Sequence, residues 1–308
     1  MQYTIQSTLT QDTARLTTAL ALDPSGARIE VQCLLQHVLK TSRAWLLAHP
    51  EYCLSDSEQA QYAALLQRRL CGEPIAYMLG EREFFGLMFK VTPDVLIPRP
   101  ETELLVELAL ERVPDKQLPP SPPAPLPLAG EGGRKAGRGC AFRVLDLGTG
   151  SGAIALSIAH ACPATQVLAC DASAAALKVA RENAQRLGIT NTTFVQSDWF
   201  EALYAQRFDL IVSNPPYIAA GDPHLQCGDV RFEPASALAS GNDGLHDIRR
   251  IVSQTKTHLD RDGWLLLEHG YDQVARVREL LQQNGFGEIF SACDLARIER
   301  VSGGRIFS

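Results

Sequence analysis

The chain has 308 residues, of which 45% are hydrophobic, and a formal net charge of −6 at pH 7. This length allows one large domain and a smaller one, with the composition of an ordinary globular protein. The acidic balance argues against bulk electrostatic binding of nucleic acid, and no apolar run approaches the ~20 residues that cross a bilayer.

Helical periodicity dominates the first part of the chain. From about Ile29 to Leu70, apolar residues recur at three- and four-residue spacing, and Gly72-Glu73-Pro74 then ends the pattern. We predict that residues 1–80 form a small helical domain.

Residues 81–113 are predicted to form a hairpin and a connecting helix. The stretch from Glu83 to Val91 has Gly86 near its centre, as a hairpin turn requires, and a helix is expected from about Glu101 to Arg112. Residues 114–140 are rich in proline and glycine. Sequence of this kind cannot bury a core, so we predict a disordered insertion there.

From residue 141 to 308, predicted strands alternate with helices. The expected strands are Arg143–Leu147, Gln166–Asp171, Thr193–Gln196, Phe208–Val212 and Trp264–Glu268, with a final edge hairpin near Gly287–Ser291 and Ile298–Val301. Alternation of this kind predicts an α/β fold with a parallel sheet covered by helices.

Cysteine and histidine patterns give no indication of a metal site. The eight cysteines include no C-x-x-C pair and the seven histidines no H-E-x-x-H pattern, so we predict no bound metal. Residues Met1 to Thr4 lack the basic start of a signal peptide. We therefore expect a cytoplasmic protein with reduced thiols.

A glycine-rich turn follows the first strand of the predicted sheet. It consists of Gly148, Thr149, Gly150, Ser151 and Gly152. Glycines permit a tight turn and let a cofactor approach bare backbone. Asp171 ends the second strand, where its carboxylate can accept both hydroxyls of a ribose. The pattern also satisfies the dinucleotide fingerprint G-x-G-x-x-G/A, so NAD is an alternative on this turn alone.

An aromatic residue, Trp199, follows the third strand in Ser197-Asp198-Trp199-Phe200. A ring beside polar groups suits an adenine, although Trp199 taken alone is equally well explained as a core residue. Together with the segment after the fourth strand, it favours S-adenosylmethionine over NAD.

That segment is Asn214-Pro215-Pro216-Tyr217, at the end of a predicted buried strand. A planar amide with no neighbouring nucleophile or base suits the binding of another planar NH2 group, whose nitrogen is presented to an electrophile. The carboxyl end of a strand is where open α/β sheets place their chemistry. The alternative is a proline turn that only closes the strand.

These motifs resemble the class I S-adenosylmethionine-dependent methyltransferases that alkylate amino or amide nitrogens. Further segments are similar to the protein-(glutamine-N5) methyltransferase family of peptide chain release factors: Gly72–Tyr77, Ile97–Glu103, Asp229–Pro234, Gly241, Asp243–Leu245 and Leu267–Gly270. The resemblance covers most of the chain. It departs from the family at 114–140, where the family has a very short connection.

The resemblance implies a Rossmann-like, mostly parallel seven-stranded sheet with helices on both faces. It implies that S-adenosylmethionine is the methyl donor, bound by Gly148–Gly152, Asp171, Trp199 and Asn214. The implied substrate is the glutamine of the Gly-Gly-Gln loop of release factors, held by Asn214, Pro215, Pro216 and Tyr217. Among these, Asn214, Pro215 and Tyr217 are expected to be catalytic.

We further expect a monomer whose helical domain helps to dock the release factor, without a membrane or nucleic-acid partner. Three alternatives stay open: a glutamine methyltransferase of a ribosomal protein, an adenine-N6 methyltransferase of nucleic acid, and a binding module without turnover. Arg99 and Glu101 lie in a matching segment, but a structural ion pair explains them equally well.

Overall fold

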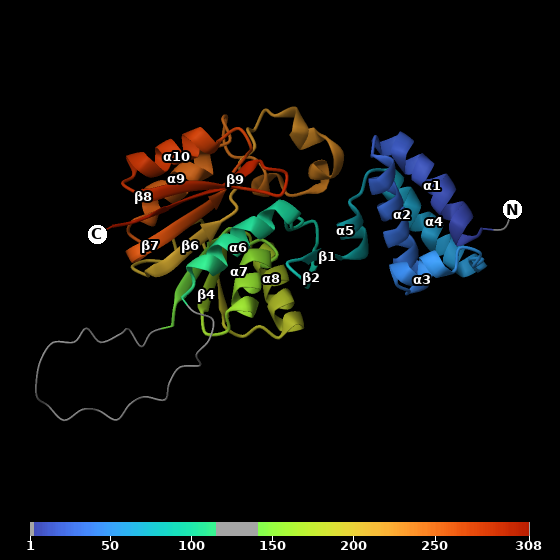
Figure 1. Ribbon diagram of the computed structural model, residues 1–308, viewed down its shortest axis with the longest axis horizontal. Coiled ribbons are helices and arrows are strands. Elements are labelled where there is room, and N and C mark those ends of the chain that lie inside the picture. The colour runs from blue at the N-terminus through green and yellow to red at the C-terminus, as the bar shows by residue number, and fades with distance from the viewer. Residues whose placement is uncertain (1–2, 115–140, 308) are drawn as a thin grey trace, which may run out of the picture. The chain divides into compact units, whose positions relative to one another are not determined.

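The computed structural model describes residues 3–114 and 141–307 (Figure 1). Apart from Pro114, the predicted insertion at 114–140 lies outside the described residues. The chain forms two compact units. Counting only the described residues, the first, here the helical unit, falls within 1–81, 91–93 and 223–233, and the second, the sheet unit, falls within 82–90, 94–222 and 234–308.

The helical unit contains α1 (Ile5–Leu20), α2 (Pro24–Leu39), α3 (Arg43–Ala48), α4 (Asp56–Leu70) and α5 (Ile75–Leu79). Local sequence fixes where these helices begin. At α4, the Ser55 hydroxyl accepts a hydrogen bond from the Glu58 N–H while the Glu58 carboxylate accepts one from the Ser55 N–H. The helices bury a common apolar core that includes Ile5, Leu16, Leu34, Leu35, Leu46 and Tyr62. The predicted helical periodicity is thus confirmed.

One buried cation joins distant parts of the helical unit. The Arg69 guanidinium, at the end of α4, donates to Glu30 Oε2 at 2.7 Å and Oε1 at 2.9 Å, and to Asp229 Oδ1 at 2.8 Å. The carbonyls of Gly72 and Glu73 accept further bonds at 3.2 and 3.0 Å. A rigid planar fork can satisfy this many acceptors where an ammonium cannot.

Asp229 lies in residues 223–233, which contain the 3-10 turns η2 (Pro223–Gln226) and η3 (Gly228–Phe232). Arg231 in the same segment donates to the Cys71 carbonyl at 2.9 Å. Gly72 leaves room for this contact, since a Cβ there would lie 1.9 Å from Arg231 Nη2, and its φ is +93°. We call residues 223–233, with the contacts from Arg69 and Cys71, the anchored segment.

The sheet unit begins at the second residue of the predicted hairpin, which consists of β1 (Glu81–Phe84) and β2 (Leu87–Lys90). The 3-10 turn η1 (Pro100–Thr102) follows. Its large sheet has the order β5-β4-β3-β6-β7-β9-β8. The strands are β3 (Arg143–Leu147), β4 (Gln166–Asp171), β5 (Thr192–Gln196), β6 (Phe208–Ser213), β7 (Leu259–Glu268), β8 (Gly287–Cys293) and β9 (Glu299–Arg305). The pairs among β3, β4, β5, β6 and β7 are parallel, and β9 runs antiparallel to both β7 and β8, so the predicted seven-stranded, mostly parallel sheet is confirmed.

Helices cover both faces of this sheet (Figure 1). On one face, α6 (Glu103–Arg112), α7 (Ala153–Ala161) and α8 (Ala174–Leu187) share a core with Val144, Leu210 and Leu266. On the other face, α9 (His246–Thr255) and α10 (Val274–Gln283) pack with Leu145, Ile211 and Leu265. The 3-10 turn η4 (Ala235–Ala237) precedes α9. Strand residues alternate between the two cores because successive side chains point to opposite faces.

The final hairpin is present at one edge of the sheet, as predicted. Strand β9 lies between β7 and β8, and β8 forms the edge. The Gly303 position explains how β9 fits inside: a Cβ there would lie 2.6 Å from Leu266 Cδ2. Glycine therefore allows the close approach of an internal strand.

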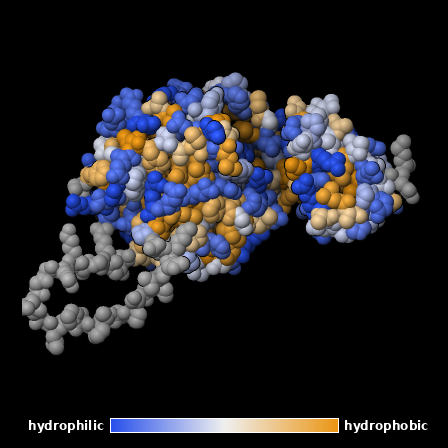
Figure 2. All heavy atoms as spheres, in the orientation of Figure 1, coloured by the Kyte–Doolittle hydropathy of each residue, from blue (hydrophilic) through white to orange (hydrophobic). Residues whose placement is uncertain are grey.

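Hydrophilic side chains are interspersed with hydrophobic ones over the face shown in Figure 2. Among the described residues, no helix is both long enough and apolar enough to span a membrane.

Replacing Arg69 with methionine is expected to release the anchored segment. Breaking a buried ion pair costs roughly 3–5 kcal/mol, which we reduce to roughly 2 kcal/mol because both acidic partners are partly exposed. The fraction of molecules in which the anchored segment is open should then rise at least about tenfold. Trypsin cleavage after the exposed Arg231, followed by mass spectrometry, measures this. Arg15→Met, which removes the exposed partner of the buried Asp12 on α1, is the control and should leave the rate unchanged. Equal rates in the two variants would contradict the role of Arg69.

Candidate functional site

The glycine turn lies between β3 and α7. The N–H groups of Gly148 and Thr149 both donate to the Cys170 carbonyl at 2.9 Å, which fixes the turn to the end of β4. Gly148, Gly150 and Gly152 have φ values of +74°, +55° and +84°, a region that other residues rarely adopt. The positive φ values explain why the turn needs glycine at all three positions.

Space beside the turn differs from one glycine to the next. A Cβ at Gly150 would meet no atom within 4 Å, whereas one at Gly152 would lie 3.0 Å from Leu156 and 3.3 Å from Ala180. Gly152 thus serves the close packing of α7 and α8, and Gly150 leaves bare backbone open. An incoming group can therefore approach the turn at Gly150.

A buried amide, Asn183 on α8, supports the turn from behind. Its Nδ2 donates to the Ser151 carbonyl at 2.9 Å and to the Lys90 carbonyl at 2.9 Å, and its Oδ1 accepts from the Lys90 N–H at 2.7 Å. The hairpin and the turn are thereby fixed to the same side chain.

Asp171 ends β4 beside the turn. Its Oδ2 accepts from the Gly150 N–H at 2.9 Å and its Oδ1 from the Ser173 N–H at 2.8 Å. Each carboxylate oxygen has a second lone pair, so Asp171 can still accept two hydroxyl groups. Burial raises the pKa of Asp171, although the two backbone donors oppose this.

Trp199 packs against the turn from the end of β5. A Cβ at Gly148 would lie 3.4 Å from the Trp199 ring, so the ring faces bare backbone. The indole Nε1 donates to Asp247 Oδ1 at 3.1 Å, and Asp247 Oδ2 accepts from the Ser240 hydroxyl at 2.7 Å. The indole N–H is therefore used internally, and what Trp199 offers to a ligand is the face of its ring.

Asp146 lies at the base of the turn and is fully buried. Its Oδ2 accepts from the Thr149 hydroxyl at 2.6 Å and from the Ala155 N–H at 3.2 Å. Its Oδ1 has no partner among the described residues. Burial raises the pKa of Asp146 to about 7. A further hydrogen-bond donor at Oδ1 would satisfy this buried oxygen.

Asn214 leaves the sheet directly beside the glycine turn. In the parallel pairing of β3 with β6, Leu147 is opposite Ser213, and the Ser213 hydroxyl donates to the Leu147 carbonyl at 2.7 Å. Gly148 and Asn214 are the next residues on these two strands. The Asn214 Nδ2 donates to the Thr102 hydroxyl at 3.2 Å. Pro215 is buried, while Asn214, Pro216 and Tyr217 are partly buried.

A buried carboxyl group, Glu268 at the end of β7, lies behind this segment. The Tyr217 hydroxyl donates to Glu268 Oε1 at 3.4 Å, a long bond, and Oε2 has no partner among the described residues. Burial raises the pKa of Glu268 to about 7, while interaction with the Thr102 hydroxyl has the opposite effect. Burial, with the Glu268 charge, also raises the pKa of Tyr217, so its hydroxyl stays protonated.

The backbone of Tyr217 is held by Gln273. The Gln273 Nε2 donates to the Tyr217 carbonyl at 2.9 Å, and Oε1 accepts from the Gly270 N–H at 2.9 Å. Gly244 makes room for this contact, since a Cβ there would lie 2.3 Å from the carbonyl oxygen of Tyr217. The Asp243–Leu245 and Leu267–Gly270 segments thus both serve the geometry of Tyr217.

The residues predicted from sequence fall into two adjoining groups, one around the glycine turn and one around Asn214. Side chains that the sequence did not assign to the site support both groups: Asn183, Asp247, Thr102, Glu268 and Gln273. Thr102, Glu268 and the neighbours of Gln273 lie in segments that resemble the family. In the sequence, this resemblance was the only sign that they belong to the site. Asn183 and Asp247 are single polar residues on amphipathic helices, and no pattern distinguishes them.

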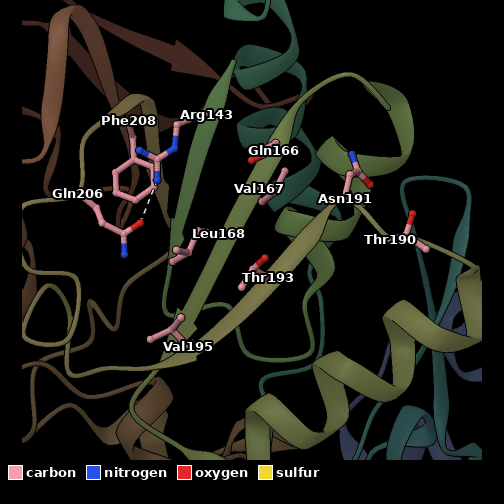
Figure 3. Close-up of a pocket in the computed structure, with 10 residues that line it drawn as sticks. All are labelled: Arg143, Gln166, Val167, Leu168, Thr190, Asn191, Thr193, Val195, Gln206 and Phe208. Carbon is pink, nitrogen blue, oxygen red and sulfur yellow. Dashed lines mark hydrogen bonds between the residues drawn. The ribbon is translucent and has the colours of Figure 1, made fainter. Parts of the chain in front are cut away.

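The cavity drawn in Figure 3 lies away from these residues, near the amino ends of the strands. It has a volume of about 390 Å³, and its lining includes Arg143, Gln166, Asn191 and Phe208, which lie at or directly before the amino ends of four strands. Arg143 closes one side by donating to Gln206 at 2.9 Å (Figure 3). The site residues follow the carboxyl ends of the same strands. No group of metal-binding side chains occurs within residues 3–114 and 141–307.

The amino-acid sequence matches known protein families. Residues 138–284 match the Methyltransferase small domain family, and residues 11–80 match the PrmC N-terminal domain family. The release factor glutamine methyltransferase of Bordetella pertussis is 50% identical over 286 residues, which cover 92% of this chain and 97% of that protein. The enzyme of the same name from Vibrio cholerae is 44% identical over 306 residues, 99% of this chain and 98% of that protein.

A solved structure of a methyltransferase from Pyrococcus furiosus is similar with a TM-score of 0.51. The match covers 80% of this chain and all of that one at 16% identity, and it shows the fold alone.

The sheet order, the glycine turn and the segment after β6 define a class I methyltransferase. Sequence identity of 50% and 44% with the two relatives, over nearly the whole length, identifies the family within this class. The chain belongs to the release factor glutamine methyltransferase family, and the family and enzyme class predicted from the sequence are confirmed.

Replacing Asp171 with alanine is expected to weaken binding of S-adenosylmethionine at least about tenfold, or ~1.4 kcal/mol. The variant loses the carboxylate that would accept hydrogen bonds from the ligand, and it loses the hydrogen bond that holds the Gly150 N–H in the turn. Isothermal titration calorimetry measures the affinity. The matched control, Glu279→Ala, removes an exposed carboxylate on α10 and should bind as the unaltered protein does. An unchanged affinity in Asp171→Ala would rule out a ribose contact.

Burial of Glu268 predicts a pH dependence of stability. A carboxyl group whose pKa is raised from 4.5 to about 7 stabilises the fold fully below pH 4.5, and this contribution is lost as the pH rises through 7. Glu268→Gln carries no such charge. Its free energy of unfolding, relative to the unaltered protein, should rise by up to roughly 3 kcal/mol between pH 5 and 8. Urea unfolding followed by circular dichroism tests this, with Glu279→Gln as control; a pH-independent difference would contradict it.

Proposed function

We propose that this protein transfers the methyl group of S-adenosylmethionine to the side-chain amide nitrogen of the glutamine in the Gly-Gly-Gln loop of peptide chain release factors. The observation that carries the proposal is the position of Asn214. Its amide leaves β6 beside the glycine turn, so a bound acceptor amide and a group on the turn would meet. Relatives 50% and 44% identical bear the name release factor glutamine methyltransferase.

The residues around the turn fit the methyl donor. The open backbone at Gly150 would receive its amino-acid part, and the free lone pairs of Asp171 would accept the ribose hydroxyls. The Trp199 ring, held by Asp247, would cover the adenine face. We also assign Thr149, Ser151 and the remaining glycines of the turn to binding of S-adenosylmethionine. Asn214 would lie where S-adenosylmethionine meets the acceptor glutamine.

Asn214 and Pro215 would hold the acceptor. A primary amide is a poor nucleophile because its nitrogen lone pair is delocalised into the carbonyl. The Asn214 Oδ1 and the Pro215 carbonyl are two acceptors for its two N–H groups, and they would favour the positive charge that develops on that nitrogen. Pro216 keeps Pro215 extended, which sets the direction of its carbonyl. Tyr217 would form the wall of the pocket.

The donor supplies a methyl carbon on positively charged sulfur, which is already a strong electrophile. The chain's contribution is therefore orientation and electrostatics, without a strong base. Holding two reactants in line supplies several kcal/mol, about 7 in favourable cases. The methylated nitrogen then loses its proton to water.

We assign recognition of the protein partner in part to the helical domain, residues 1–80. The hairpin and helix at 81–113 connect it to the catalytic segment, residues 141–308. The helical unit contains no part of the turn or of Asn214–Tyr217. We propose a monomer acting in the cytoplasm, where release factors work.

Asn214→Ala is expected to lower kcat about a hundredfold or more, since it removes a preorganised acceptor, with little change in affinity for S-adenosylmethionine. Kinetics with labelled donor and calorimetry give the two values. Asn284→Ala is the matched control, because its amide is also partly buried but bonds to the Leu280 carbonyl at the end of α10. Normal turnover by Asn214→Ala would refute the assigned role.

The function itself is tested with labelled S-adenosylmethionine and purified release factor, compared with a release factor whose Gly-Gly-Gln glutamine is alanine. We expect label on the first and none on the second. Equal labelling of both would refute the acceptor. Absence of label on both, with label on a ribosomal protein or on nucleic acid, would favour the corresponding alternative enzyme.

A further inference from the structure

Asn214 can assist an acceptor amide only in one of its two orientations. The acceptor NH2 group is a hydrogen-bond donor, so the Asn214 oxygen has to face it. Rotation of the side-chain amide by 180° would present the Asn214 NH2 group instead, and two donors would oppose each other. The oxygen and nitrogen ends have nearly the same size, so packing alone does not choose between them.

The structure contains a chain of polar groups that makes this choice. The Asn214 Nδ2 donates to Thr102 Oγ1 at 3.2 Å. Thr102 is only 4% exposed, and its hydroxyl interacts with the carboxyl group of Glu268, which is 2% exposed. A hydroxyl has one proton to donate. If that proton goes to Glu268, the Thr102 oxygen can only accept from Asn214.

The backbone places these three groups together. Ser213 on β6 is opposite Leu267 on β7, so the residues that follow, Asn214 and Glu268, lie at the same level of the sheet. Thr102 ends the 3-10 turn η1, where its N–H donates to the Arg99 carbonyl at 3.1 Å. All of these residues belong to the sheet unit.

We propose that Thr102 and Glu268 are positioning residues that turn the Asn214 side-chain oxygen toward the acceptor amide. The inference rests on the proposed function and adds two residues to it. Both protonation states of Glu268 keep an oxygen that accepts from Thr102. The orientation of Asn214 is therefore set before substrate binds, as preorganised catalysis requires.

Two pairs of variants separate hydrogen bonding from packing. Thr102→Val keeps the shape but removes the hydroxyl, and Thr102→Ser keeps the hydroxyl. Glu268→Met removes the acceptor, so that Thr102 is free to donate to the Asn214 oxygen, and Glu268→Gln keeps an accepting oxygen. Thr255→Val is the matched control, because Thr255 is a fully buried threonine whose hydroxyl bonds to the Ile251 carbonyl within α9.

The measurements are kcat and KM for release factor and the affinity for S-adenosylmethionine. We expect kcat to fall about tenfold or more in Thr102→Val and Glu268→Met, with donor affinity within about twofold. Thr102→Ser, Glu268→Gln and Thr255→Val should keep kcat. The double variant Thr102→Val/Glu268→Met should be no slower than Thr102→Val alone, since both changes interrupt one chain of bonds.

Full kcat in Thr102→Val would overturn the proposal, as would an equal loss in Thr102→Ser, which would indicate packing. Additive losses in the double variant would also overturn it. These outcomes are distinct from failure of the proposed function, in which the unaltered protein itself would not methylate release factor.

Discussion

The site depends on the register of three parallel strands. Leu147 on β3, Ser213 on β6 and Leu267 on β7 are paired in line, so the residues that follow them lie at one level of the sheet. The next residues are Gly148, Asn214 and Glu268. A shift of one residue in either pairing would turn the side chains that follow to the other face of the sheet. The apolar cores on both faces oppose such a shift, and packing of the sheet thereby sets the geometry of the chemistry.

The sequence predicted those parts of the fold and site that have a local pattern. Helical periodicity, buried strands, the glycine turn and the Asn214 segment each occupy a few consecutive residues, and the structure has them where they were expected. Thr102 and Glu268 were not predicted to take part. The bond from Asn214 to Thr102 spans 112 positions in sequence, and a single polar residue at the end of a helix or strand is typical of many structural roles. Only tertiary structure brings such groups together.

Buried carboxyl groups flank both halves of the site, and each has an oxygen without a partner among the described residues: Asp146 Oδ1 and Glu268 Oε2. Leaving a buried acceptor unsatisfied costs about 1–3 kcal/mol. Perturbed carboxyl groups of this kind gather at functional sites. The cost is tolerated because the large apolar cores on the two faces of the sheet stabilise the unit that contains them.

The anchored segment has a consequence for how the protein can be divided. The helical unit consists of three stretches of chain, and Asp229 in the last of them shares Arg69 with Glu30 in the first. A hybrid that joined residues 1–80 of one relative to the remainder of another would therefore combine partners of this ion-pair cluster from different sources. The modules that can be exchanged intact are not continuous in sequence. Recombination between members of the family would preserve the helical unit only if residues 223–233 moved with it.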